Sequence, residues 1–520
     1  MATRVGSSSR VGRVVGRPLQ VALALGLLSA AAVALVAPLN SWFAFSRPVV
    51  WVTTIAAVSL LIWWLRRSSP DPRAAGGART TVIHGTSART VWLGVALGTL
   101  LSGVHAGLAL IPFGWDARRI FSSASTLAAG QTLPHEAVSY FARYPHNVRL
   151  LAAEQAAIEA GSGLGLPALA SVLLPHVLCV AVVLWALGRA CGDLGRPGAV
   201  PVVQALATVL LGLSPNVAVP YTDVPAAAGV TVAAAAMVRC SRSWHWGWAV
   251  IGAVGLGLGI ALKPYAVVLV IAAVLVALGS RQLRQVLRVA VLGLVVVGMV
   301  ETVSVVGGAV TGLSEERLAQ VEQPFPPEHF LAMGTWNSQE ESVVRRWGAY
   351  RQDQVDATAA MDPETRSELL ATQAQSQVAD RGLLGNAHFF GAKAVWVWGD
   401  GTFWAHGEGA DGAAPSSVPK PWSVLTEASR GAGSLYPWRA AVVQGIWLGV
   451  VLATAGALWL ARPDPLLTTW VLALGGLTAY LMIFEARPRY LLAFLPLVLL
   501  VLVRAGLGSA DHRPATPEAR

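Results

Sequence analysis

The sequence predicts an all-α polytopic membrane protein with about twelve spanning helices. Of the 520 residues, 54% are hydrophobic and only 13% are charged, whereas soluble domains carry about 25% charged residues. The apolar residues fall in runs close to the ~20 residues that cross the ~30 Å hydrocarbon core of a bilayer. The arginines gather in short clusters between these runs, which is typical of cytoplasmic loops.

The predicted spans follow the apolar runs in order. They lie at 19–37, 48–65, 90–113, 163–188, 200–219, 224–238, 245–262, 264–280, 286–311, 438–461, 466–484 and 488–505. The run at 264–280 is the weakest, because it directly follows Lys263-Pro264 and also fits a hairpin half or a re-entrant segment. The run at 19–37 also fits a cleavable signal peptide, but its length favours an uncleaved helix.

The basic residues predict the orientation of these spans. With the Arg-rich N-terminus in the cytoplasm, counting forward places every short basic loop on the cytoplasmic side. These loops include 66–89, the pair Arg239 and Arg242, and the stretch 281–288. The net charge of +10 therefore reflects membrane orientation, and no nucleic-acid partner is expected. We expect a multi-pass protein of the plasma membrane with both termini cytoplasmic and its active face external.

This topology divides the chain into five parts. Residues 1–89 hold a cytoplasmic N-terminus, two extra helices and a linker, and 90–311 form a transmembrane core with an external loop at 114–162. The remaining parts are a large external loop at 312–437, C-terminal spans at 438–505 and a cytoplasmic tail at 506–520. Loops as long as 312–437 are usually functional.

The first candidate site residue is Asp116, at the outer end of the third predicted span. Residues 116–130 and 135–160 are predicted to form two amphipathic helices that lie on the membrane and hold Asp116 over a cavity at the lipid boundary. An aromatic and basic stretch suited to the headgroup layer contains Tyr144, His146 and Asn147. The alternative is an interfacial tryptophan belt with ordinary flanking charges.

A second candidate acid, Asp223, lies in a very short turn between two spans. Its alternative role is in a helix N-cap ahead of Pro225. A cationic group, Lys263, Arg487 and Arg489, occupies the outer ends of other spans. Lysine and arginine bind phosphate well, and ionisable groups at such depth usually serve a site, although snorkelling to lipid headgroups is the alternative.

Two further pairs of residues complete the predicted binding set. Glu485 and Tyr490 flank the two arginines. Trp398 and Asp400 belong to a Trp-Gly-Asp stretch of the large loop, where an aromatic ring beside an acid suits a sugar or equally a membrane interface. Asp400 is also close in sequence to His406, Glu408 and Asp411, but the spacing matches no standard cation loop. We therefore expect no metal or other cofactor, with a divalent cation as the alternative.

In their order along the chain, these pieces resemble the GT-C superfamily of membrane glycosyltransferases, within the branch of protein mannosyltransferases and lipid A aminoarabinose transferases. The resemblance covers about 90–505. The strings that carry it are GWDARRIF, YFARYPHN, PYTDVPA, LKPYA, PEHFLAMG, WVWGDGTF and EARPRYLLAFLP. The chain departs from the family in two ways: its acid follows the third span rather than the first, and Arg118 stands where many relatives have a second acid.

The resemblance implies an enzyme that moves a sugar from a polyprenyl-phosphate donor to an acceptor hydroxyl at the external face, with inversion. Asp116 would be the base, the cationic group would bind the phosphate, and Asp223 would orient a substrate. The acceptor, whether protein, lipid or glycan, stays open. The sequence has no P-loop, which argues against coupling to nucleotide hydrolysis within this chain. Two alternatives remain: a transporter or flippase, and a surface polysaccharide polymerase or ligase.

Overall fold

The computed structural model describes residues 16–39, 46–67, 83–109, 111–337, 347–405, 422–431 and 433–506. Within these ranges the chain is helical, and the only β-type pairing is an isolated bridge between Asn337 and Trp347. Most of the predicted linker at 66–89 and nearly all of the predicted tail at 506–520 lie outside the described residues. The same holds for three of the residues considered for a cation, His406, Glu408 and Asp411.

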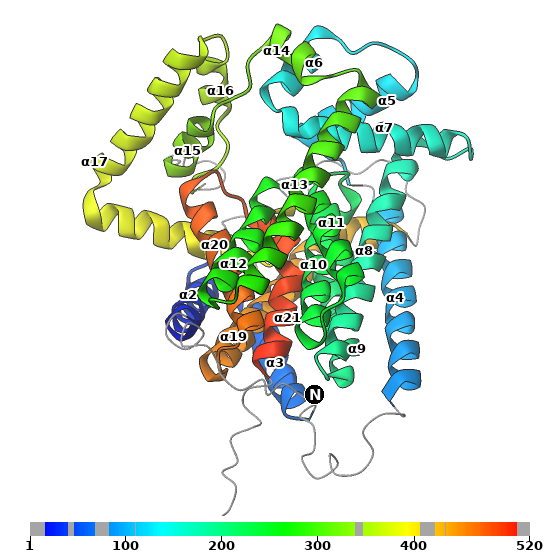
Figure 1. Ribbon diagram of the computed structural model, residues 1–520, viewed down its shortest axis with the longest axis vertical. Helices are drawn as coiled ribbons and strands as arrows, with labels where there is room; N and C mark the ends of the chain where they lie inside the picture. Colours follow the sequence, from blue (N-terminus) through cyan, green and yellow to red (C-terminus); the bar gives the residue numbers. More distant parts are fainter. Residues whose placement is uncertain are drawn as a thin grey trace, which may run out of the picture.

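Nine helices of the described chain are long and apolar enough to cross a membrane. They are α2 (Gly16–Val36), α3 (Arg47–Arg67), α4 (Ile83–Leu108), α8 (Ala168–Asp193), α10 (Asp223–Arg242), α13 (Leu283–Thr311), α19 (Tyr436–Leu460), α20 (Pro465–Ile483) and the continuous segment of η8 (Pro488–Phe494) and α21 (Leu495–Ala505). Figure 1 shows them gathered in one bundle. The predicted all-α, multi-span architecture is therefore confirmed.

Three shorter apolar helices coincide with the remaining predicted spans. They are Pro197–Gly212, which includes α9 (Val200–Ala207), then α11 (Trp246–Leu262), and Pro264–Gly279, which includes α12 (Val268–Gly279). The first of them ends at Gly212, seven residues before the predicted run does. A span count of twelve stays a prediction.

Helix α10 lies at the centre of the bundle, where it is largely buried. Its small residues allow a close approach by α11: Gly229 lies against the backbone of Gly255 and Gly259, while Ala236 lies near Gly252. Small residues commonly bring membrane helices together in this way. The contacts pair the start of α10 with the end of α11, so the two helices run antiparallel and Asp223 comes close to Lys263.

Short helices collect at one end of the bundle, which we call the loop end (Figure 1). They are α5 (Trp115–Ala128), α6 (His135–Arg143), α7 (Val148–Ser162), α14 (Glu315–Val321), α15 (Pro327–Thr335) and α16 (Gln352–Thr358), together with the long α17 (Pro363–Trp398). A further short helix, α18 (Ser423–Ser429), precedes α19.

The prediction of a single helix over 135–160 was wrong. The chain forms α6 and α7 instead, joined by a 3₁₀ turn at Pro145–Asn147. Proline disfavours the helical conformation in the residue before it, and Tyr144 accordingly leaves the helix with φ −126° and ψ 64°. This break places Tyr144, His146 and Asn147 in a turn between the two helices, where Asn147 is buried.

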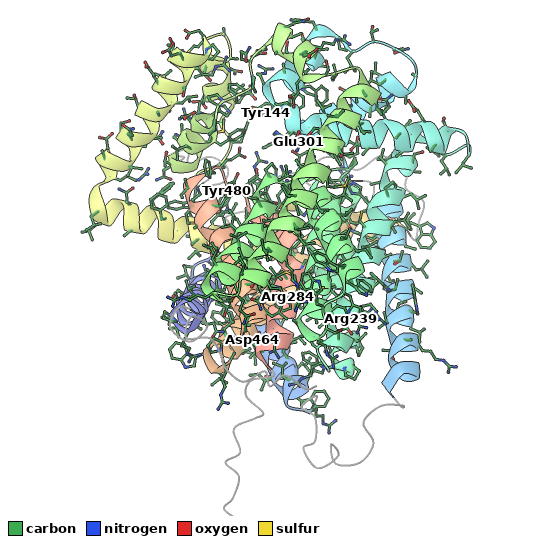
Figure 2. The ribbon with its side chains drawn as sticks, viewed as in Figure 1. Tyr144, Arg239, Arg284, Glu301, Asp464 and Tyr480 are labelled. Carbon is green, nitrogen blue, oxygen red and sulfur yellow. The ribbon has the colours of Figure 1, made fainter. Side chains whose placement is uncertain are left out.

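Two arginines that the sequence assigns to the cytoplasm lie away from the loop end. Figure 2 shows Arg239 and Arg284 in the lower half of the bundle, whereas Tyr144 lies at the top. Exposed glutamines at each end offer matched positions for labelling: Gln131 and Gln375 at the loop end, and Gln282 ahead of α13.

We expect Gln131→Cys and Gln375→Cys to react with a membrane-impermeant maleimide in intact cells, and Gln282→Cys to react only after permeabilisation. The physical reason is that lysine and arginine are retained on the cytoplasmic side. Replacement of the three native cysteines, Cys179, Cys191 and Cys240, removes the background. Labelling of Gln282→Cys alone in intact cells would show that the orientation is the reverse of the predicted one.

Candidate active site

The centre of the candidate site is a buried group of ions at the loop end. Asp223 begins α10, and its two carboxylate oxygens lie 3.0 Å from Lys263 Nζ and 4.0 Å from Arg489 Nε. All three residues are at most 6% exposed. Thr222 occupies the N-cap position of α10 but makes no capping hydrogen bond with its side chain. The Asp223 carboxylate instead contacts the two cations.

Prolines place these two cations. Lys263 ends α11 and precedes Pro264, and Arg489 follows Pro488 at the start of η8. A residue before proline is pushed toward extended backbone, and both Lys263 and Arg487 have extended φ and ψ angles. The helical backbone is therefore interrupted at both points, and both interruptions lie close to the N-terminus of α10.

Three tyrosine rings surround the Lys263 ammonium group. Its Nζ lies 4.8 Å from the ring centroids of Tyr221 and Tyr490 and 5.9 Å from that of Tyr265. The Arg489 guanidinium also lies over Tyr221, at 4.8 Å. Cations over aromatic faces gain from the ring quadrupole, more so when water is excluded. The rings thus help to retain two positive charges in a dry environment.

Asp116 is connected to this buried ion group through Tyr221. The Tyr221 hydroxyl donates a hydrogen bond of 3.2 Å to Asp116 Oδ2, while its ring contacts both Lys263 and Arg489. Asp116 itself is half-buried in the first turn of α5. The structure therefore brings the two predicted acids and two of the three predicted cations into one site.

The turn between α6 and α7 supplies the next layer. Asn147 Nδ2 donates a 2.7 Å hydrogen bond to the hydroxyl of buried Tyr140. Burial, and then the charge of Asp116, raise the pKa of Tyr140 well above its ordinary value. Burial lowers the pKa of His146 to about 4, against the opposing effect of Asp116. His146 is therefore neutral at neutral pH.

The third predicted cation, Arg487, has a different set of neighbours. Its guanidinium lies 4.3 Å from the ring centroid of Trp115, and its Nε is 3.7 Å from Glu485 Oε1. Tyr490 also donates to that carboxylate oxygen, at 3.3 Å. Burial raises the pKa of Glu485, and the two arginines oppose that shift. Trp115 has a positive φ of 51°, which is uncommon for a residue with a side chain.

Tyr144 lies between these groups and the large loop. Burial raises the pKa of Tyr144, and Tyr350, Asp116 and Glu485 each raise it further. Tyr350 in turn lies 6.4 Å from Trp115, between ring centroids. Burial and the charge of Asp116 raise the pKa of Tyr350 to about 12. Part of the 312–437 segment therefore lines the site.

Lys393 of α17 was not singled out from the sequence. This fully buried lysine donates to three backbone carbonyls: Gly334 O at 2.7 Å, Met482 O at 3.0 Å and Phe484 O at 2.8 Å. The segment after α20 is also bound by the loop directly, because Glu485 N donates to Phe330 O and Ala486 N to Gly348 O. These contacts fix the backbone that carries Arg487 and Arg489.

Trp398 and Asp400 are placed elsewhere. Trp398 is buried at the end of α17, where its ring stacks on Trp447 and its Nε1 donates to Thr478 Oγ1. Asp400 is 1% exposed and accepts hydrogen bonds from the Thr402 and Trp404 backbones. These contacts order the turn between α17 and the segment that follows, and they do not include the residues around Asp116.

Within the described residues, no cluster of three or more histidine, cysteine, aspartate or glutamate side chains is arranged to hold a metal ion. The carboxylates near Asp116 contact arginine, lysine and tyrosine instead.

The fold and this cluster define an integral membrane protein with a buried group of ionisable residues at one end of its helical bundle. A family model described as "Conserved hypothetical integral membrane protein" matches residues 99–506, and the chain belongs to that family. The match contains every site residue from Trp115 to Tyr490. No curated protein matches the chain.

We expect Asp223→Asn to destabilise the protein by about 3–5 kcal/mol, because it leaves Lys263 and Arg489 buried without their carboxylate. Chemical unfolding of the purified protein, followed by tryptophan fluorescence, measures this loss. Asp193→Asn is the matched control, since its partner Arg239, at 3.0 Å, has a side chain that is 36% exposed, and the contribution of an ion pair falls toward about 0–1 kcal/mol as water reaches it. Equal losses in the two variants would contradict the buried-ion interpretation.

Proposed function

We propose that this protein is a membrane glycosyltransferase that moves a sugar from a polyprenyl-phosphate donor to an acceptor hydroxyl at the external face. The observation that carries the proposal is the connection of Asp116, through Tyr221, to buried Lys263 and Arg489. A half-buried acid beside a desolvated cationic group provides both parts of such a transfer, a proton acceptor and a site for an anionic leaving group.

The cationic side of the site suits a phosphate. Arginine presents several N–H donors in a fixed fork and lysine adds a compact charge. Asp223 keeps Lys263 and Arg489 in place before any substrate arrives. Preorganised charge of this kind stabilises a transition state without reorganisation during the reaction. A donor with a lipid tail would reach the loop end from within the bilayer.

The acid side of the site suits proton removal. In the proposed step, an acceptor hydroxyl gives its proton to Asp116 while its oxygen forms a bond to the anomeric carbon. The bond from that carbon to the donor phosphate breaks, and its electron pair stays on the phosphate oxygen next to the cations. Attack opposite the leaving group inverts the anomeric centre. In this proposal, neutral His146, whose pKa is influenced by Asp116, and Asn147, which donates to Tyr140, orient the acceptor.

The two alternatives predict different observations. A transporter or flippase needs a path for its substrate through the bundle, whereas the cluster of tyrosines, acids and cations lies at the loop end. A polysaccharide polymerase or ligase would use the same external arginines, but its donor would carry a pyrophosphate and an oligosaccharide. Purified protein supplied with each donor class distinguishes these functions by release of the lipid phosphate or pyrophosphate.

Arg487→Ala and Arg489→Ala should each weaken use of the donor by about 10-fold or more, because each loses one charge-assisted contact of about 1.5–3 kcal/mol. Lysine should restore only part of the loss, because the forked contact is missing. The measurement is KM for a short-chain polyprenyl-phosphate sugar. Arg504→Ala is the control, since Arg504 pairs with Asp464 at the other end of the same helical segment. Unchanged KM in both site variants would favour snorkelling to headgroups.

Asp116→Asn should lower turnover by about 10²–10⁴-fold, the usual contribution of a general base. Asparagine keeps the size and a hydrogen-bonding oxygen but cannot take up a proton at neutral pH. Release of polyprenyl phosphate by the purified protein is the measurement, and donor binding should be largely retained. Glu136→Gln, at an exposed acid of α6, is the matched control.

Two results would overturn this assignment. Full turnover in Asp116→Asn would place the base elsewhere, with Asp223 and Glu485 as the remaining acids of the cluster. Absence of turnover by the wild-type protein with every lipid-linked sugar, in a preparation that binds none of them, would reject the glycosyltransferase proposal itself.

A further inference from the structure

Helix α17 consists of two halves that meet at a sharp bend. Gly382 has φ 60° and ψ −174°, outside the helical region, and the helix changes direction there. Only glycine adopts such a conformation without steric cost. Figure 1 shows one half rising toward the other loop-end helices and the other half running sideways from the bend to the bundle near α20.

The outward faces of the two halves differ in chemistry. The exposed residues of the first half are mostly polar and include Glu364, Thr365, Glu368, Thr372, Gln375 and Ser376. In the second half the exposed residues are Leu383, Leu384, Ala387, His388 and Gly391. Leu383 and Leu384 are 86% and 85% exposed, more than any other large hydrophobic side chain in the described residues.

The charged groups of the second half point away from this apolar face. Lys393 is buried against backbone carbonyls, and Arg381, at the bend, donates to Thr335 O and Asn386 Oδ1. His388 is the one ionisable side chain on the face, and its ring lies 5.8 Å from that of Trp347. The face therefore presents leucine with almost no charge.

The second half lies at the level where membrane-spanning helices end. Its Trp398 donates to Thr478 near the end of α20, and Lys393 bonds to Met482 O and Phe484 O at that helix end. Gly399, which follows Trp398, packs close to Ala34 in the last turn of α2. Two spans thus fix this half of α17 at one border of the apolar bundle.

We propose that the second half of α17 is a membrane-interface helix, with Leu383 and Leu384 inserted among lipid acyl chains of the leaflet at the loop end. An apolar helix face parallel to a bilayer binds at the boundary between headgroups and acyl chains. The polar first half then stands in water, which explains why the composition changes at Gly382. Because this half of α17 lies where the spans end, lipid is the partner that we expect to cover its apolar face.

This contact gives the large loop a second attachment. One attachment is the set of hydrogen bonds from Lys393 to the segment after α20. The other is the bilayer itself, about two to three helical turns earlier in α17. The inference depends only on the membrane fold and not on the proposed transfer reaction.

The test uses the full-length protein, free of native cysteines, in phosphatidylcholine nanodiscs. A nitrobenzoxadiazole label is attached at Leu384→Cys and, as the matched control, at Leu369→Cys, a leucine of the first half that is 44% exposed. We expect blue-shifted emission at Leu384→Cys and strong quenching by nitroxide placed on the acyl chains near the headgroup. The label at Leu369→Cys should be quenched by aqueous iodide instead.

A second variant separates lipid insertion from simple burial. With the label at Ala387→Cys, the double change Leu383→Glu and Leu384→Glu should abolish quenching by lipid nitroxide, because buried charge is costly in hydrocarbon. Both leucines are exposed, so the fold should persist. Iodide quenching at Leu384→Cys would overturn the proposal, as would protection from both quenchers, which would instead indicate a protein partner.

Discussion

Asp223, Lys263 and Arg489 form a group of buried ions on which the arrangement of the bundle depends. Removal of an ion from water costs several kcal/mol even after the protein relaxes. The cost is offset only when opposite charges meet with good geometry, and here three separate chain segments must come together to achieve that. The start of α10, the end of α11 and the start of η8 therefore cannot shift independently of one another. Tyr221, Tyr265 and Tyr490 surround this group and exclude water from it.

The packing of small residues allows these three chain segments to come close together. Gly229, Gly255 and Gly259 bring the backbones of α10 and α11 into contact, so the ends of the two helices are also close. The helix dipole adds to the effect, since Asp223 lies in the first turn of α10, where a negative charge is favoured. Tertiary packing and local electrostatics thus favour the same placement of the carboxylate.

Much of this site could be predicted because the hydropathy of a sequence indicates how deep in the membrane each residue lies. Polar residues at the ends of apolar runs share one level of the membrane, so Asp116, Asp223, Lys263 and Arg487 could be grouped before their contacts were known. Hydropathy does not say which helix ends are neighbours. The role of Tyr221 as the link between the two acids therefore required the fold.

Other features depended on contacts that a single sequence does not contain. Trp398 and Asp400 stand in a stretch that looks like a binding motif, but burial against Trp447 and the hydrogen bonds of a turn account for their positions. Lys393 lies in a helix of mixed composition, and its three carbonyl partners come from two distant segments. The break at Pro145 was visible in the sequence, yet amphipathic periodicity on both sides obscured it.

The large loop and the buried ions are mechanically connected through one short segment. Burial lowers the pKa of Lys393 to about 7, and the nearby Glu485 opposes that shift. The protonated amine has three N–H groups for its three carbonyl partners, whereas the neutral amine has only two. The charged form therefore holds Gly334, Met482 and Phe484 together. Glu485, Arg487 and Arg489 follow Phe484 directly along the chain. Because the backbone after α20 is bonded to the loop on one side and its arginines contact the site on the other, the loop determines where the cations lie.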